Sequence, residues 1–217
     1  MSDIAIIGGH GKVALHLARI LTDASQTVGS LIRNPQQRAD ITAVGATPVI
    51  ADVENLTTEQ IAQVLVGYDA VVWSAGAGGG SAERTYAVDR DAAIRSMDAA
   101  RLAGVTRYVM VSYKGSRVDH GASQDDGMFA YYEAKAAADD YLRATDLSWT
   151  ILGPSTLTQA VASGRIDVGA NLPPGDVSRE NVARVVAAIL AKPATIGRFI
   201  EFNDGQTPIE EAVDAAS

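Results

Sequence analysis

The order of hydrophobic and polar residues predicts a strand, a glycine turn and a helix at the start of the chain. After Asp3, residues 4–7 form an apolar run that is too short to span a membrane and leads directly into glycines. Behind the glycines, hydrophobic residues recur on one face of a helix: Val13, Ala14, Leu17, Ala18 and Leu21. This order of patterns is typical of a β-turn-α unit.

The same alternation continues through the next two thirds of the chain. Short apolar runs predict further strands at residues 27–32, 46–51, 69–75, 107–112 and 148–152. Amphipathic stretches lie between them, including a long helix over 82–103 and a helix with an inward stripe at Ala134, Ala137, Ala138, Tyr141 and Leu142. Continuous apolar strands that alternate with helices predict an α/β fold: a Rossmann-type, doubly wound parallel sheet with helices on both faces.

After residue 153 the chain is broken by prolines and glycines into shorter pieces. We expect a turn with a short strand or hairpin over 159–168, a helix that begins after Ser178, a last strand over 198–202 and a fraying tail over 208–216. Ligands of parallel sheets bind beyond the carboxyl ends of the strands, so residues 153–178 are expected to form a small substrate-side or lid segment. The length of 217 residues then suits a single domain over 1–217.

Composition narrows the possible functions. The formal net charge of −8 argues against nucleic acid or an acidic membrane surface as the main partner. The chain has no cysteine, which excludes disulfides and thiolate chemistry, and its three histidines have no metal-ligand spacing, so we expect no metal. The N-terminal pattern is neither a signal peptide nor a membrane span, and we expect a cytoplasmic protein. Nothing in the sequence indicates an oligomeric state.

The first glycine turn is a candidate site for a dinucleotide. Gly9, Gly11 and Ala14 fit the pattern G-x-G-x-x-G/A. In this pattern the first glycine allows a tight turn, the second lets the backbone approach a pyrophosphate, and the helix N-terminus favours the anion. A turn with a purely structural role is the alternative. If a dinucleotide binds, the whole turn is expected to contact it: Gly8, Gly9, His10, Gly11, Lys12 and Val13.

The ends of the next three predicted strands suggest where such a cofactor would lie. Arg33 ends the second strand, where an acid would bind a ribose 2′-hydroxyl and an arginine suits a 2′-phosphate, so NADP is favoured over NAD. An ordinary solvated arginine is the alternative. Asp52, followed by Val53, closes the third strand near the expected adenine. Small residues close the fourth strand, where backbone would pass beside the ribose: Ala75, Gly76 and Ala77, within a glycine run that ends at Gly80.

A second group of residues suggests acid/base chemistry. Tyr131 and Lys135 are four residues apart on one face of a predicted helix, and Ser112 ends the adjacent strand at the same edge of the sheet. A nearby ammonium favours the phenolate of a tyrosine, and a serine can hold a substrate carbonyl. The alternative is structural: Tyr131 packs at the helix start and Lys135 flanks it.

These motifs together resemble a known family. The ordered set GGHGKVA, IRNP, Asp52-Val53, SAGAGGG, VMVS, YYEAK, WTILGPSTLT and SRENVARVVAAIL is similar to the atypical, extended-type short-chain dehydrogenase/reductases. It is most similar to their NAD(P)H-binding branch, which includes nitrogen-regulator-like proteins and biliverdin-IXβ/flavin reductases. Many relatives have arginine before the proline that follows the sixth strand, whereas this chain has Gly153 before Pro154, and Pro154 is expected at the cofactor.

The resemblance implies a Rossmann fold, NADP and a site formed by Ser112, Tyr131 and Lys135. In that site Tyr131 would donate a proton, while Lys135 would lower the tyrosine pKa and hold the nicotinamide ribose. We therefore expect an NADP-dependent oxidoreductase acting on a small-molecule carbonyl, alcohol, quinone or flavin-like acceptor. A non-catalytic NADP-binding sensor is the alternative. A sugar-nucleotide epimerase is less favoured, because the region after residue 153 is short for a nucleotide-sugar lobe.

Overall fold

Seven parallel strands form most of one large sheet and extend to one of its edges. The computed structural model describes residues 2–78 and 81–216. Within them the sheet order is β11-β8-β10-β6-β5-β4-β1-β2-β3, so the chain reverses direction of travel between β1 and β4. The parallel strands are β1 (Asp3–Ile7), β2 (Thr27–Ile32), β3 (Thr47–Ile50), β4 (Ala70–Trp73), β5 (Arg107–Val111), β6 (Ser148–Pro154) and β10 (Arg198–Asp204).

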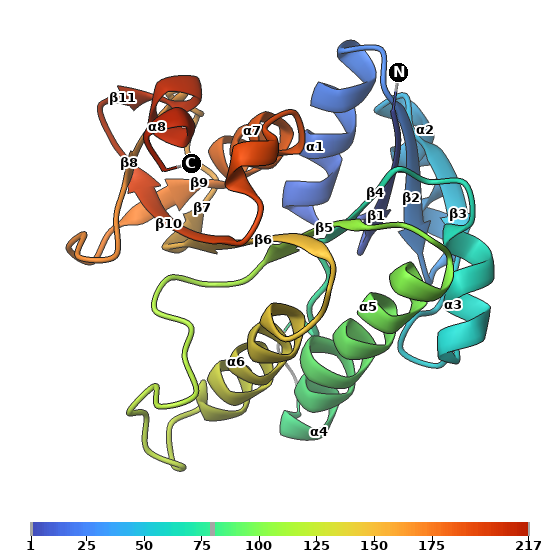
Figure 1. Cartoon of the computed structure of the whole chain (residues 1–217), viewed down its shortest axis with the longest axis horizontal. Helices are drawn as coiled ribbons and strands as arrows, with labels where there is room; N and C mark the ends of the chain where they lie inside the picture. Colours follow the sequence, from blue (N-terminus) through green and yellow to red (C-terminus); the bar gives the residue numbers. More distant parts are fainter. Residues whose placement is uncertain (1, 79–80, 217) are drawn as a thin grey trace.

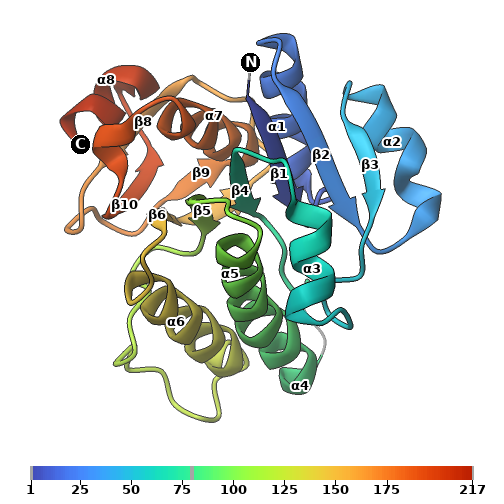
Figure 2. The same ribbon diagram turned by 45° about the vertical axis from the view of Figure 1, so that its right-hand side comes forward.

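Helices cover both faces of this sheet, as the sequence pattern predicts (Figure 1). One face packs against α1 (Lys12–Asp23), α2 (Arg38–Ala43), α7 (Arg179–Leu190) and α8 (Ile209–Ala215). The other face packs against α3 (Thr58–Leu65), α5 (Ala93–Leu102) and α6 (Phe129–Arg143). The turned view in Figure 2 separates the two layers, with α1 and α7 on one side of the strands and α3, α5 and α6 on the other. The doubly wound α/β prediction is confirmed.

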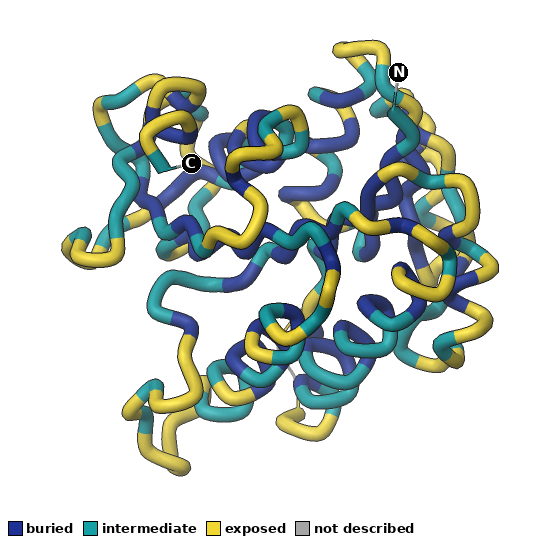
Figure 3. The backbone as a smooth tube through the Cα atoms, in the orientation of Figure 1, coloured by how far each residue is buried: buried dark blue, intermediate teal, exposed yellow. Residues whose placement is uncertain are grey.

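The alternation along each strand explains why the sheet needs both layers. In β1, Ile4 and Ile6 pack in one hydrophobic cluster, whereas Ala5 and Ile7 pack in the other, and all four are buried. Successive side chains of a strand point to opposite faces, so a strand that is apolar at every position requires cover on both sides. The tube in Figure 3 shows these strands as buried segments, whereas the loop between β5 and α6 is largely exposed.

The predicted long helix has an irregular middle. Helical structure runs through α4 (Ala82–Thr85), η2 (Tyr86–Ala92) and α5 (Ala93–Leu102), and η2 is a π-helix. A π segment widens one turn of a helix and is frequent at functional sites. Here it contains the buried carboxylate Asp89, which is 1% exposed. Periodicity alone did not predict this insertion.

The C-terminal third contains short strands that the sequence predicted only in part. β8 (Arg165–Val168) pairs antiparallel with β10 and with β11 (Thr207–Pro208), so it is not half of a local hairpin. β7 (Thr156–Thr158) and β9 (Asp176–Ser178) form a separate parallel pair. Short 3₁₀ turns lie at η1 (Pro35–Gln37) and η3 (Pro193–Thr195).

Two further expectations about this third are settled by the structure. The helix start at Ser178 is confirmed, because its hydroxyl oxygen accepts a hydrogen bond from the backbone N–H of Asn181. The expected fraying of residues 208–216 is wrong. They contain α8, which buries Ile209, Ala212 and Val213 against the same hydrophobic cluster as α7.

Candidate active site

The first glycine turn lies between β1 and α1, at the point where the sheet order reverses. Gly8 has φ of +81°, and a Cβ there would lie 2.5 Å from the Cα of Ala75 in the loop after β4. Gly9 has no positive φ, and a Cβ there would lie 2.6 Å from the Cβ of Ser30 in β2. Gly8 therefore forms the tight turn that the sequence pattern assigned to Gly9, and Gly9 allows close packing on β2.

The carboxyl ends of four strands surround a cavity of about 270 Å³, which we call the glycine cleft. It lies at the reversal between β1 and β4, which is where doubly wound sheets bind nucleotides. Nine of the residues predicted to contact a cofactor line it: Gly8, His10, Gly11, Arg33, Asp52, Val53, Ala75, Gly76 and Ala77. Gly79 and Gly80, which end the predicted glycine run, lie outside the described residues.

Other predicted cofactor residues do not line this cleft. Val13 is 6% exposed and belongs to the hydrophobic core, and Lys12 lines a different cavity beside α1. Gly9 is used for packing, as described above. Pro154 lines a second cavity, and Lys135 is buried between the two cavities' walls without lining either of them. Val13 and Lys12 miss the cleft because of their positions in α1. Successive side chains of a helix point in different directions, so only some of those in its first turn can face the cleft at its N-terminus.

Two arginines face one carboxylate in the glycine cleft. Nη1 of Arg33 and Nη2 of Arg84 each lie 3.5 Å from Oε2 of Glu54. Arg84 also donates a hydrogen bond to the carbonyl of Ala77. The sequence predicted Arg33 but not Arg84 or Glu54, because Arg84 approaches from α4, fifty residues further along the chain. The cleft can therefore offer two guanidinium groups to a phosphate that replaces the Glu54 carboxylate.

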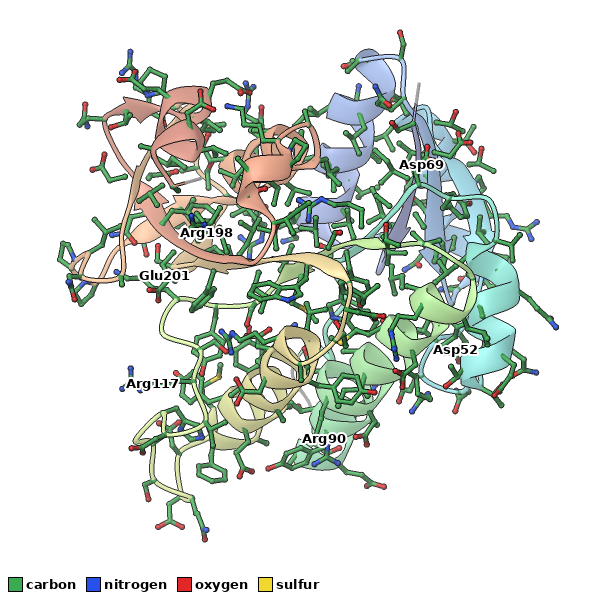
Figure 4. All side chains as sticks on the ribbon, viewed as in Figure 1. Asp52, Asp69, Arg90, Arg117, Arg198 and Glu201 are labelled. Atoms are coloured by element: carbon green, nitrogen blue, oxygen red, sulfur yellow. The ribbon has the colours of Figure 1, made fainter. Side chains whose placement is uncertain are left out.

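Polar contacts at the rim of the cleft hold its loops. Nε2 of His10 lies 2.7 Å from Oδ2 of Asp40 in α2. Oδ2 of Asp52 accepts a 2.8 Å hydrogen bond from the side-chain amide of Asn55. Asp52 and Arg117, both labelled in Figure 4, mark the two ends of the candidate site, since Asp52 lines the glycine cleft and Arg117 lines the second cavity.

The second cavity, of about 650 Å³, lies at the carboxyl ends of β5 and β6. We call it the tyrosine pocket, because Tyr113, Tyr131 and Tyr132 line it. Their rings pack on one another, with centroids 5.2 to 6.0 Å apart. Ser112, Pro154 and residues of the segment 153–178 line it as well, so this segment lies on the expected side of the sheet.

A lysine fastens the segment 153–178 beside the tyrosine pocket. Nζ of Lys114 donates hydrogen bonds of 2.6 and 2.7 Å to the carbonyls of Leu172 and Pro173. The N–H of Lys114 in turn donates to the carbonyl of Pro154. The loop after β5 and the segment after β6 therefore form one connected wall of the pocket.

Lys135 does not act on Tyr131 in the way that the resemblance implies. Its Nζ lies 3.3 Å from Oδ1 of Asp89 and donates to the carbonyl of Val111, and its side chain is 4% exposed. The pKa of Tyr131 is raised, first because the phenol is buried and then because the carboxylates of Asp89 and Asp139 are near it. The expectation that Lys135 lowers this pKa is wrong in this arrangement, since Asp89 already balances the ammonium.

Asp89 lies close to lining residues of both cavities, Ala77 in the glycine cleft and Tyr131 in the tyrosine pocket. Its Oδ1 pairs with Lys135, and its Oδ2 accepts a 2.9 Å hydrogen bond from the backbone N–H of Ala77 in the glycine cleft. Both charged side chains of the pair are almost completely buried. A buried ion pair of this kind fixes the relative position of the groups around it, because neither charge can lose its partner cheaply.

Ser112 also has an unpredicted partner. Its hydroxyl donates to Oδ2 of Asp139, and Oδ2 accepts a second bond of 2.6 Å from the hydroxyl of Ser116. Asp139 has 0% exposure, and burial raises its pKa, whereas the two serine hydroxyls and the charge of Lys135 act in the lowering direction. Asp139 continues the helical line of Tyr131 and Lys135 at the next i+4 position, which is the sequence signal that could have identified it.

Among residues 2–78 and 81–216, no three His, Asp or Glu side chains come together in a way that could hold a metal ion. No helix in this part of the chain is long and apolar enough to cross a membrane.

Comparison with known proteins identifies relatives along nearly the whole chain. A family model described as NAD(P)H-binding matches residues 8–193. A Bacillus subtilis protein named as the uncharacterized sugar epimerase YhfK is 32% identical, over 97% of this chain and 98% of its own length. A solved structure from Bacillus halodurans, described as a putative NAD-dependent epimerase/dehydratase, superposes with a TM-score of 0.91 at 30% identity, covering 99% of this chain and all of that one.

A second solved structure, the oxidoreductase ylbE from Lactococcus lactis, has a TM-score of 0.87 at 30% identity and covers 98% of this chain and 95% of its own. These matches confirm the Rossmann-type fold and the resemblance to the NAD(P)H-binding branch that the ordered motifs indicated.

Proposed function

This chain belongs to the NAD(P)H-binding family, and we propose that it is an NADP-dependent oxidoreductase that transfers a hydride between the nicotinamide and a small carbonyl, alcohol, quinone or flavin-like acceptor. The observation that carries the proposal is the placement of two cavities at one edge of the same sheet. The glycine cleft suits a dinucleotide, and the tyrosine pocket beside it presents the hydroxyl groups of Ser112 and Tyr131. When bound, the nicotinamide would supply or accept the hydride.

The residues of the glycine cleft support binding of the cofactor. The turn at Gly8 brings the N-terminus of α1 to the cleft, where free N–H groups favour a pyrophosphate. Asp52 and the small residues Ala75, Gly76 and Ala77 line the same cleft, where Asp52 would meet the adenine and the small residues would leave room for a ribose. Lys135 does not line the cleft, but its ammonium, held by Asp89 and the carbonyl of Val111, keeps a third hydrogen for the nicotinamide ribose.

The choice of NADP rests on Arg33, with Arg84 as a second contact. Both guanidinium groups point toward the Glu54 carboxylate inside the cleft, and no acid occupies the position of Arg33. A 2′-phosphate would offer these arginines a doubly charged partner, whereas a 2′-hydroxyl would not.

The roles in the tyrosine pocket follow from protonation. Because the pKa of Tyr131 is raised, its phenol stays protonated and can donate a hydrogen bond to the oxygen of an acceptor. Ser112 lies at the end of β5 and lines the same pocket, so its hydroxyl could reach the same acceptor oxygen. We therefore assign both hydroxyls to binding and polarising the acceptor, with residues 153–178 as the substrate-side part of one domain.

A non-catalytic NADP-binding sensor is the second candidate. It is favoured by one observation, the neutralisation of Lys135 by Asp89, which removes the usual means of activating a tyrosine. An epimerase acting on a nucleotide sugar, suggested by the name of the Bacillus subtilis relative, would need the tyrosine pocket to hold a sugar.

Two measurements test the proposal. Dissociation constants for NADPH and NADH, from the quenching of protein fluorescence, should favour NADPH, and Arg33→Ala should weaken NADPH by about tenfold while leaving NADH unchanged. Arg38→Ala, an exposed arginine outside the cleft, is the matched control. Tighter binding of NADH, or equal effects of the two variants, would contradict the assignment to NADP.

Turnover is tested by following NADPH oxidation with a panel of quinones, flavins, aldehydes and ketones. Tyr131→Phe should reduce turnover at least tenfold with little change in NADPH affinity, and Tyr132→Phe, its neighbour in the same pocket, should have the smaller effect. Tight binding of NADPH without turnover on any of these acceptors would favour the sensor. Exchange of label at a sugar carbon of a nucleotide sugar would favour the epimerase.

A further inference from the structure

We propose that Asp139 supplies and recovers the proton of the reaction through the hydroxyl of Ser112, which is the group that meets the acceptor. The proposal rests on the oxidoreductase function proposed above and adds to it a proton route that does not use Tyr131 as the exchanging group.

The first argument is the geometry of the three side chains. Asp139 is completely buried, so its carboxylate has no direct contact with solvent. Ser112 lines the tyrosine pocket and donates its hydroxyl hydrogen to Oδ2 of Asp139. Ser116 donates to the same oxygen but does not line the pocket. Among the described residues that bond to Asp139, Ser112 alone lines the pocket.

The second argument concerns the direction of the Ser112 hydrogen bond. When the Asp139 carboxylate accepts the hydroxyl hydrogen, the lone pairs of the serine oxygen remain for a group in the pocket. Ser112 can then accept a hydrogen bond from a bound alcohol. When Asp139 is protonated, the same hydroxyl can turn and donate to a bound carbonyl. The hydroxyl thus serves both directions of a redox reaction.

The third argument is that the other candidate groups are unsuited to exchange a proton. Burial and two nearby carboxylates raise the pKa of Tyr131, so the phenol remains protonated and acts as a fixed donor. Lys135 is paired with Asp89 in an environment where losing the charge would leave a buried carboxylate alone. Asp139 remains as the buried carboxyl group bonded to a pocket hydroxyl, and burial raises its pKa above the ordinary range, the direction that suits a general acid.

The charged and titratable groups around Asp139 come from three parts of the fold. Lys135 and Arg143 on α6 act to lower its pKa, and the bonds from Ser112 and Ser116 act in the same direction. Asp89 on the π segment faces Lys135 and offsets its charge. The phenols of Tyr113 and Tyr131 lie close enough for the Asp139 carboxylate to raise their pKa values.

The step balances as follows for reduction of a carbonyl. The carbonyl carbon receives a hydride supplied by the reduced nicotinamide, and the C=O π bond opens toward oxygen. The oxygen takes the proton of the Ser112 hydroxyl, and Ser112 takes the proton of the Asp139 carboxylic acid. The products are the alcohol, oxidised NADP and the Asp139 carboxylate. A proton from water in the emptied pocket returns through Ser112, and oxidation of an alcohol follows the reverse path.

The test compares pH profiles of NADPH oxidation by 9,10-phenanthrenequinone, with benzaldehyde as a second acceptor. The rate of acceptor reduction by the wild-type protein should fall as the pH rises through the pKa of Asp139, because a smaller fraction of Asp139 is then protonated. Asp139→Asn can still accept both serine hydrogen bonds, yet it should lower kcat by about 100-fold and remove this limb of the profile. The affinity for NADPH is measured for each variant and should change by less than threefold. A change this small would show that the variant is folded.

The two serines provide a matched pair of variants. Ser112→Ala should reproduce the loss of rate seen in Asp139→Asn, and the double variant should be no slower than either single one. Ser116→Ala removes an equivalent bond to the same oxygen but leaves the pocket hydroxyl in place. It should keep turnover within about threefold and move the limb to higher pH, since a bond that lowers the Asp139 pKa is lost.

The outcomes separate the two proposals. If the wild-type protein reduces either acceptor and Asp139→Asn keeps the pH limb, the proton route is wrong and the oxidoreductase function stands. Equal losses of turnover in Ser112→Ala and Ser116→Ala would overturn the route as well. This comparison decides the question even if Asp139→Asn does not fold. If the wild-type protein binds NADPH and reduces neither these acceptors nor the wider panel, the proposed function fails and the route fails with it.

Discussion

The glycine cleft and the tyrosine pocket lie at the same edge of one sheet, but different kinds of interaction form them. The glycine cleft is shaped by backbone, since Gly8 and Gly9 each meet a neighbouring strand or loop at a distance that leaves no room for a Cβ. The tyrosine pocket depends on side chains, in particular the buried carboxylates Asp89 and Asp139 and their partners. A backbone site requires glycines at fixed positions, whereas a side-chain site requires partners that the fold brings together.

The largest expected effect tests whether these two regions are independent. Asp89→Ala should leave the buried Lys135 without its carboxylate and the N–H of Ala77 without its acceptor. Removing one member of a buried ion pair typically costs about 3–5 kcal/mol, and we expect a loss of this size in the free energy of unfolding measured with urea. Because Asp89 accepts a hydrogen bond from the glycine cleft and its charge acts on Tyr131 of the tyrosine pocket, NADPH affinity and turnover should both fall.

Asp89→Asn is the control for that prediction. Its amide oxygen can still accept from Ala77, so the loop of the glycine cleft should keep its position, whereas Lys135 loses its counter-charge. Compared with Asp89→Ala, the Asp89→Asn variant should therefore regain more of the NADPH affinity than of the turnover. If Asp89→Ala changes stability by less than 1 kcal/mol, or changes only one of the two functional measurements, the proposed link between the cavities is absent.

The next effect in size concerns the glycine cleft alone. Gly8→Ala would place a Cβ 2.5 Å from backbone of Ala75 at a residue with φ of +81°, so it combines left-handed strain with overlap. We expect a loss of about 2–4 kcal/mol in the free energy of unfolding and a loss of NADPH binding beyond tenfold. Thermal unfolding would measure the loss of stability, and fluorescence titration would measure the loss of NADPH binding.

Gly67 provides a matched position for separating strain from overlap. It also has positive φ, +91°, but a Cβ there would meet nothing within 4 Å. Gly67→Ala should cost only about 1–2 kcal/mol and should leave NADPH affinity unchanged, because it lies in the turn before β4 and outside the cleft. Equal losses in the two variants would mean that backbone overlap with Ala75 does not shape the cleft.

The difference between the two regions also explains what could be predicted from the sequence. The strands and α1 were predicted because their signal is local: a continuous apolar run for each strand and an i, i+4 stripe for the helix. The order of strands then places Gly8, Arg33, Asp52 and Ala75 around one cleft without further information. Only the division of roles between Gly8 and Gly9 required the actual backbone angles.

The side-chain contacts of the tyrosine pocket could not be predicted in the same way. Asp89 lies in a π segment that no periodicity indicates, and its partner Lys135 is 46 positions later in the chain. Asp139 did carry a signal, as an acid on the inward line of Tyr131 and Lys135. The residues Ile209, Ala212 and Val213 likewise form a helical stripe that could have indicated α8, although a fraying tail was predicted there. The effect of Lys135 on Tyr131 was mispredicted because a lysine's influence depends on which carboxylates are already beside it.

The smallest expected effect is a pH dependence of stability that belongs to the tyrosine pocket. Burial raises the pKa of Asp139 above its value of about 3.9 in an unfolded chain, so between these two values the folded state binds more protons than the unfolded state. The free energy of unfolding should then fall as the pH rises through this window. Relative to wild type, Asp139→Asn should become the more stable protein as the pH increases, which urea unfolding at a series of pH values would measure.

A carboxylate outside the pocket supplies the opposite sign. Asp146 is exposed and accepts a hydrogen bond from Arg101, which lowers its pKa, so its stabilising contribution is present at neutral pH and lost as the pH falls. Asp146→Asn should therefore approach wild-type stability in acid, whereas the stability advantage of Asp139→Asn should grow toward neutral pH. Parallel curves for wild type and Asp139→Asn would show that Asp139 titrates as it does in the unfolded chain, and the tyrosine pocket would then lack the buried acid that distinguishes it from the glycine cleft.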